Sequence, residues 1–185
     1  MTLIALVLFL IFALSALGVG VLASVSDIRG LAIPNLYSVL IAAAFVPAYG
    51  VMWIFGYQGV FSPLWSHIAA LVLIFVLSAV LFQLKVMGAA DSKMASAYAL
   101  WLGLAALPMY LFIMTLCGAV LGAVALYIKK KKPFANVAPE SWVGQLQAGG
   151  SKVPYGAAIF CGALYAFYSK GYIDIVRLSE FFGGT

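Results

Sequence analysis

Two aspartates, Asp27 and Asp91, lie at the ends of long apolar stretches in a chain that has only five acidic residues. An ionisable side chain at membrane depth is costly, and it commonly marks a functional site. Two carboxyl groups that approach closely cannot both ionise, so one of them keeps its proton. The ionised group can activate water as a general base, while the protonated group hydrogen-bonds a carbonyl oxygen and stabilises the developing oxyanion. The pair therefore predicts cleavage by water that needs no metal, cofactor or covalent intermediate.

The residues alone leave two other interpretations open. Arg29 and Lys93 follow the two aspartates closely, so each carboxylate could simply form an ion pair that marks a membrane boundary. Alternatively, Asp27, Asp91 and Lys93 could form a proton or cation relay in a transporter. Against the relay, both aspartates are predicted at one boundary, whereas carriers place their binding sites near the midplane.

The composition requires a lipid environment for the elements that hold these residues. Hydrophobic residues make up 66% of the chain and charged residues only 8%, whereas a soluble domain has about 25% charged residues. A chain this short cannot bury so much apolar surface in an aqueous core, so we expect a polytopic membrane protein. The N-terminal apolar stretch lacks a basic start and is long enough to span, so we expect a retained helix and not a signal peptide.

The apolar stretches predict an all-α protein with about six transmembrane helices, since a span needs about 20 residues. Residues 94–128 would extend roughly 50 Å as one helix, so we expect a reversal near Gly103 to Pro108. A second reversal is expected between Gly56 and Pro63, where Trp53 and Trp65 would anchor one membrane face. The predicted helices cover residues 1–26, 36–55, 65–84, 93–105, 108–128 and 154–169.

The basic residues predict the orientation. Six spans place both termini on one side, which holds only Lys170 and Arg177. The opposite side holds eight basic residues, namely Arg29, Lys85, Lys93, Lys129, Lys130, Lys131, Lys132 and Lys152. Because positive charge stays cytoplasmic, we expect extracytoplasmic termini and place Asp27 and Asp91 at the cytoplasmic boundary. We treat residues 1–170 as one membrane domain and residues 171–185 as a short tail, which could form an interfacial helix.

Three short segments carry a family resemblance. The first runs from Ser26 and Asp27 through a short basic loop to Ile33-Pro34-Asn35, which opens the next helix. The second is Met87-Gly88-Ala89-Ala90-Asp91-Ser92-Lys93, and the third is Lys152-Val153-Pro154-Tyr155-Gly156. In this order they resemble the signatures of the type IV prepilin peptidases, including the Gly-x-Gly-Asp-x-Lys motif of intramembrane aspartyl proteases.

The resemblance implies an aspartic endopeptidase of the cytoplasmic membrane with Asp27 and Asp91 as its catalytic pair. It implies that the substrate is a prepilin, whose basic leader is cleaved after a glycine at the cytoplasmic boundary so that the pilus assembly machinery can use the product. An archaeal preflagellin-type peptidase shares these motifs. The chain looks like the short form associated with Tad/Flp pili, without the cytoplasmic segment of family members that also N-methylate their product. The supporting residues that it implies are Pro34, Asn35, Gly88, Lys93, Pro154, Tyr155 and Gly156.

One position departs from the family pattern, because Ala90 stands where the second motif has its second glycine. Glycine permits a positive φ, so alanine fits only if the backbone there has a negative φ or if the loop shifts slightly. This change points to an alternative function, that of a membrane assembly factor that has lost catalysis. Gly88, Asp91 and Lys93 remain in place, so we expect an active enzyme.

The other polar features are expected to be structural. We expect Pro34 to start a helix, and Asn35 either to hydrogen-bond within its loop or to contact substrate. The only histidine, His67, is placed far from the aspartates. We expect Lys129 to Lys132 to set the topology and contact anionic lipid, not nucleic acid. Trp142 to Gln147 could rest on the cytoplasmic interface as part of a substrate entrance.

Overall fold

The computed structural model describes residues 2–183, and every regular element in this part of the chain is helical. This confirms the prediction of an all-α protein. The elements in chain order are α1 (Thr2–Gly30), α2 (Asn35–Ile54), α3 (Leu64–Gln83), α4 (Ala89–Leu102), the 3-10 turn η1 (Leu104–Ala106), α5 (Leu107–Lys131), α6 (Trp142–Gln147), α7 (Gly156–Ser169) and α8 (Ile175–Gly183).

Within residues 2–183, four helical segments are long and apolar enough to cross a membrane, namely α1, α2, α3 and the unit formed by η1 and α5. The helices α4 and α7 have 14 residues each, or about 21 Å at 1.5 Å per residue, which is shorter than a hydrocarbon core of about 30 Å. The membrane character of the chain is thus supported by four spans, while the total of six and the orientation of the termini stay predictions.

The predicted boundaries of α2 and α3 agree with the structure to within one residue. Two other helices, α1 and α4, each extend four residues beyond a predicted boundary. The first continues to Gly30, where Leu31 adopts a left-handed φ of 51° and ends it, so the predicted basic loop is largely the last helical turn. The fourth begins at Ala89 and not at residue 93, because an aspartate in the first helical turn interacts favourably with the positive end of the helix. Charge alone therefore misplaced both boundaries.

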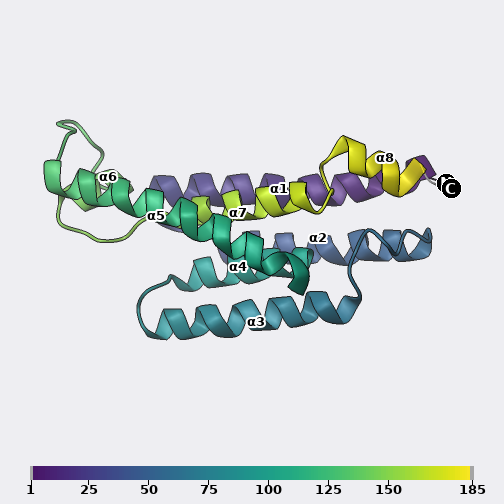
Figure 1. Ribbon diagram of the computed structural model, residues 1–185. Helices are drawn as coiled ribbons and strands as arrows, with labels where there is room; N and C mark the ends of the chain where they lie inside the picture. The colour runs from purple at the N-terminus through teal and green to yellow at the C-terminus, as the bar shows by residue number, and fades with distance from the viewer. Residues whose placement is uncertain (1, 184–185) are drawn as a thin grey trace.

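The helices form an elongated bundle in which α4 is the central element (Figure 1). It packs against α3, α2 and α7, while α1 packs against α2 and α7, and α5 packs mainly against α7. The tail helix α8 lies beside the N-terminal half of α1, where Leu178 and Phe182 are buried. Its location at a membrane interface stays a prediction.

Hydrogen bonds from buried aromatic side chains hold α4 to its neighbours. The Tyr98 hydroxyl donates to the Ala16 carbonyl of α1 over 3.0 Å, and Trp101 Nε1 donates to the Ile41 carbonyl of α2 over 2.7 Å. Gly20 makes room for Tyr98, since a Cβ there would collide with the phenol. Unsatisfied polar groups are costly inside a membrane protein. These contacts therefore set the position of α4, and with it that of Asp91, relative to α1.

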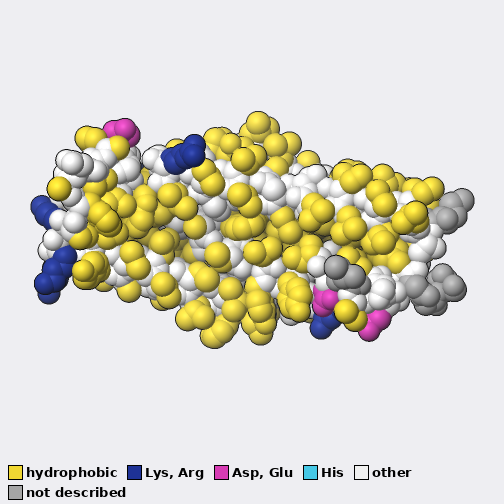
Figure 2. Space-filling view, turned by 90° about the horizontal axis from the view of Figure 1, so that it is seen from above, with side chains coloured by type: hydrophobic (Ala, Val, Ile, Leu, Met, Phe, Trp, Pro, Cys, Tyr) yellow, Lys and Arg dark blue, Asp and Glu magenta, His cyan; other side chains and the backbone are white. Residues whose placement is uncertain are grey.

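The outer surface is largely hydrophobic, as a lipid environment requires. Large hydrophobic side chains such as Leu3, Val46 and Phe112 are exposed, and hydrophobic atoms cover most of the face in Figure 2. In that view several Lys and Arg side chains gather at the end of the molecule where Figure 1 places α6. Exposed apolar surface on this scale indicates contact with lipid.

Candidate active site

Asp27 lies in the last turn of α1 and is only 5% exposed. Its Oδ2 accepts a hydrogen bond of 2.8 Å from the backbone N–H of Gly156, the first residue of α7. The first N–H groups of a helix have no partner within the helix and carry its positive end, so they are well suited to a carboxylate. The beginning of α7 therefore orients Asp27.

Gly156 has no room for a side chain. A Cβ there would lie 2.8 Å from Ile33 Cδ1 and 3.0 Å from Asp27 Oδ2. The helix begins at this residue and not at Pro154 as predicted, which leaves the Gly156 N–H pointing to the carboxylate. This contact thus brings Gly156 of the third motif next to Asp27 of the first motif.

Asp91 lies in the first turn of α4, three residues after Gly88, which precedes the helix in an extended conformation. The carboxylate lies close to this glycine, since a Cβ on Gly88 would be 2.7 Å from Asp91 Oδ2. Ala90 lies within the helix and is not among the residues with positive φ. The alanine is therefore compatible with the backbone, and the departure from the family motif leaves the local geometry intact.

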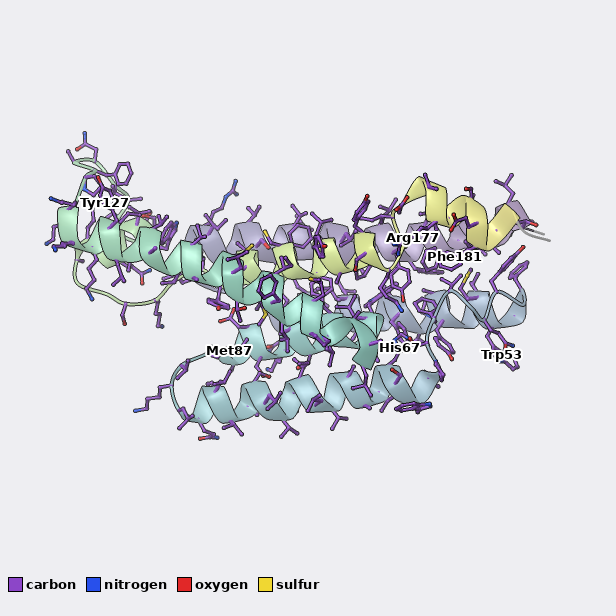
Figure 3. The ribbon with its side chains drawn as sticks, viewed as in Figure 1. Trp53, His67, Met87, Tyr127, Arg177 and Phe181 are labelled. Atoms are coloured by element: carbon purple, nitrogen blue, oxygen red, sulfur yellow. The ribbon has the colours of Figure 1, made fainter. Side chains whose placement is uncertain are left out.

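The two carboxylates line one cavity of about 760 Å³, and they are close enough to interact electrostatically. The α1–α2 connection, the end of α3, the beginning of α4, the middle of α5 and residues 151–155 form its walls. Figure 3 shows Met87, one of its lining residues, at the beginning of α4. A cavity lined by two interacting carboxyl groups can supply both a general base and a proton donor.

Lys93 and Asn35 connect α4 to α2, and neither residue lines the cavity. Lys93 Nζ donates a hydrogen bond of 2.9 Å to Asn35 Oδ1, which ties α4 to the beginning of α2, and both side chains are exposed. The prediction that Asn35 bonds within its own loop is wrong, because its partner is 58 residues away. Since Lys93 binds an amide, the structure does not favour an ion pair between Lys93 and Asp91. Pro34 immediately precedes α2, as predicted.

Tyr155 is the residue of the third motif that lines the cavity. Its hydroxyl packs on the backbone of Gly118 in α5, where a Cβ would collide with the phenol. The sequence prediction missed the contribution of α5, which lines the cavity with Met114, Thr115, Gly118 and Gly122. The spacing of Gly118 and Gly122 by four residues in an apolar helix was a signal that could have revealed this face.

Two further sequence features lie elsewhere. His67 is completely buried, and its Nδ1 donates to the Leu100 carbonyl over 2.7 Å. His67 lies toward the end of the molecule that carries Trp53, whereas Met87, which lines the cavity, lies toward the opposite end, which carries Tyr127 (Figure 3). The segment Trp142–Gln147 forms α6 and packs through Leu146 on Ala125 and Ile128. The cavity has no lining residue from α6, so the predicted role as an entrance gains no support.

The comparison with known families agrees with this arrangement. A sequence model described as the type IV leader peptidase family matches residues 14–123, more than half of the chain. The match includes both aspartates, whereas Pro154, Tyr155 and Gly156 lie beyond it. No curated protein matches the chain, and no solved structure does. The extent of the family match places this chain in the type IV leader peptidase family.

Proposed function

We propose that this protein is a prepilin leader peptidase in which Asp27 and Asp91 are the catalytic pair. The observation that carries the proposal is that two carboxylates from distant helices, α1 and α4, line one cavity. Membership of the family implies an aspartic peptidase with a prepilin substrate in general. The aspartyl mechanism and the residue roles are our own inference from the cavity.

In this mechanism one carboxylate removes a proton from a water molecule that attacks the scissile carbonyl. The other carboxyl group donates a hydrogen bond to the carbonyl oxygen as negative charge develops there. Gly156 keeps Asp27 oriented through its N–H, and Gly88 leaves space beside Asp91. Transfer of the proton to the leaving amine completes hydrolysis and regenerates the pair.

We infer that the site faces the cytoplasmic boundary of the inner membrane. Asp27 is at the end of α1 and Asp91 at the beginning of α4, and the loops that share this predicted side hold most of the basic residues. In this arrangement α4 and α7 complete six membrane helices and both termini are extracytoplasmic. A prepilin with a cytoplasmic basic leader and an apolar membrane segment would present its scissile bond at this depth.

We further propose a Tad/Flp-like prepilin as the substrate and a peptidase without N-methyltransferase activity. A preflagellin-type substrate is the alternative within the same chemistry. Both have a basic leader before an apolar segment, so the choice between them is tested by supplying each substrate separately.

The decisive experiment co-expresses the chain with a candidate prepilin and follows the leader by gel shift and N-terminal sequencing. Wild type, Asp27→Asn and Asp91→Asn are compared, with Glu140→Gln as a control that removes an exposed carboxylate elsewhere. The proposal expects cleavage by wild type and by the control, and none by either aspartate variant at equal membrane levels. Normal cleavage by both aspartate variants would refute the catalytic pair, and cleavage of preflagellin alone would reassign the substrate.

A further inference from the structure

One wall of the cavity is a single face of α5. Met114, Thr115, Gly118 and Gly122 line the cavity, and their spacing places them along one side of the helix. From Met114 to Gly122 this face covers nine residues, or about 12 Å between the first and the last. The principal packing partners of α5 are α7 and α6, so this wall faces the aspartates across the cavity without being covered by α3.

The two glycines on this wall differ in their surroundings. At Gly118 a Cβ would collide with the Tyr155 phenol, so packing within the protein explains that glycine. At Gly122 a Cβ would meet no atom within 4 Å, and the residue lines the cavity. Glycine is unfavourable inside a helix. Packing therefore does not require glycine at position 122, and its missing side chain leaves this part of the cavity wall open.

The position of Gly122 relative to the aspartates follows from two contacts. Tyr155 packs on Gly118, and the adjacent Gly156 donates to Asp27, so Gly118 lies near the level of the catalytic pair. Gly122 lies four residues further along α5, about 6 Å closer to its lysine-rich end. An extended peptide covers this distance with about two residues.

We propose that Gly122 is a specificity-determining residue that keeps open the part of the cavity receiving the last leader residues before the scissile bond. This inference rests on the proposed function, because it assumes a peptide substrate that passes between the two aspartates. The leader enters from the lysine-rich end of α5, and Gly122 sets the side-chain size that the cavity accepts there. Met114 and Thr115 lie on the other side of Gly118 and face the first mature residues.

The test uses Gly122→Ala and Gly122→Leu in the full chain. Gly18→Leu is the matched control, because Gly18 is an exposed helical glycine of α1 whose Cβ would also meet nothing within 4 Å, and it does not line the cavity. Cleavage is measured with two prepilins that differ only in the size of the second residue before the scissile bond. Retention of uncleaved prepilin is measured by pull-down in an Asp91→Asn background, which separates binding from catalysis.

We expect Gly122→Ala to slow cleavage of the bulkier substrate about tenfold more than that of the smaller one, the scale set by one methyl group in a hydrophobic pocket. Gly122→Leu is expected to lose cleavage and retention of both substrates, while Gly18→Leu behaves like wild type. The alanine variant keeps the test valid if leucine perturbs α5, since it is the smaller change in a helix that favours alanine.

Unchanged substrate preference in Gly122→Ala, or normal retention by Gly122→Leu, would overturn the inference even if both aspartates prove essential. Conversely, if the aspartate variants still cleave while Gly122→Ala changes the substrate preference as expected, the catalytic pair is wrong and the role of Gly122 stands. If wild type neither cleaves nor retains prepilin, both proposals are refuted.

Discussion

The backbone N–H of Gly156 donates a 2.8 Å hydrogen bond to Asp27 Oδ2, although 129 positions separate the two residues. This contact joins the beginning of α7 to the end of α1 and orients one carboxylate of the cavity. It also explains why the Pro-Tyr-Gly segment accompanies the aspartates in the sequence: its glycine is a structural support for Asp27.

Gly156→Ala is expected to abolish or strongly reduce leader cleavage. The new Cβ would lie 3.0 Å from Asp27 Oδ2 and 2.8 Å from Ile33 Cδ1, so α7 or the carboxylate must shift. Overpacking of this kind costs about 1–3 kcal/mol, and small displacements of catalytic groups reduce rates steeply. Cleavage rate and thermal stability in detergent are the measurements. Gly30→Ala, near the end of α1 with open space around its Cβ, is the control, and equal activity of the two variants would contradict this role.

Gly88→Ala and Ala90→Gly should differ in effect although both are single-methyl changes in one motif. A Cβ on Gly88 would lie 2.7 Å from Asp91 Oδ2, so Gly88→Ala is expected to displace Asp91 and reduce cleavage. Ala90 is helical, so Ala90→Gly is expected to cost about 0.5–1 kcal/mol of stability without raising activity. A marked gain in cleavage rate with Ala90→Gly would show that the family glycine has a catalytic advantage that this geometry does not account for.

Lys93→Met tests whether the exposed lysine takes part in catalysis or stabilises the contact between α4 and α2. Its Nζ binds Asn35 Oδ1, so we expect a loss of stability of about 0.5–1.5 kcal/mol and a cleavage rate within a few fold of wild type. A double-mutant cycle with Asn35→Ala, followed by denaturation, measures the coupling between the two side chains. Zero coupling would show that this contact does not stabilise the fold, and loss of activity comparable to that of Asp91→Asn would place Lys93 in the catalytic machinery.

The pH profile of cleavage should be bell-shaped. Two interacting carboxyl groups in one cavity titrate with two macroscopic pKa values, and only the form that shares one proton is active. The rate should therefore fall on the acid side as the base is protonated and on the alkaline side as the second proton is lost. Initial rates in reconstituted membranes across the pH range provide the test. A rate that is constant from acid to alkaline pH would exclude the shared-proton mechanism.

Much of the fold follows from the sequence because lipid imposes a simple rule on each segment separately. Apolar length predicted α2 and α3 to within one residue, and the scarcity of acidic residues singled out Asp27 and Asp91. The same rule failed where charge was used to end a helix. Asp27 and Arg29 lie within α1, and Asp91 and Lys93 lie within α4, since helix ends depend on backbone geometry and caps as well as on charge.

The sequence by itself thus determined the helical class, the long apolar segments and the two carboxylates as candidates. Only the tertiary structure decided which other residues surround them. Asn35 binds Lys93, Gly156 binds Asp27, and α5 contributes Gly118 and Gly122 to the cavity. These relationships depend on the packing angles and relative depths of helices that are far apart in the chain. Local periodicity holds no information on depth or angle, because both result from the mutual packing of side chains across the whole bundle.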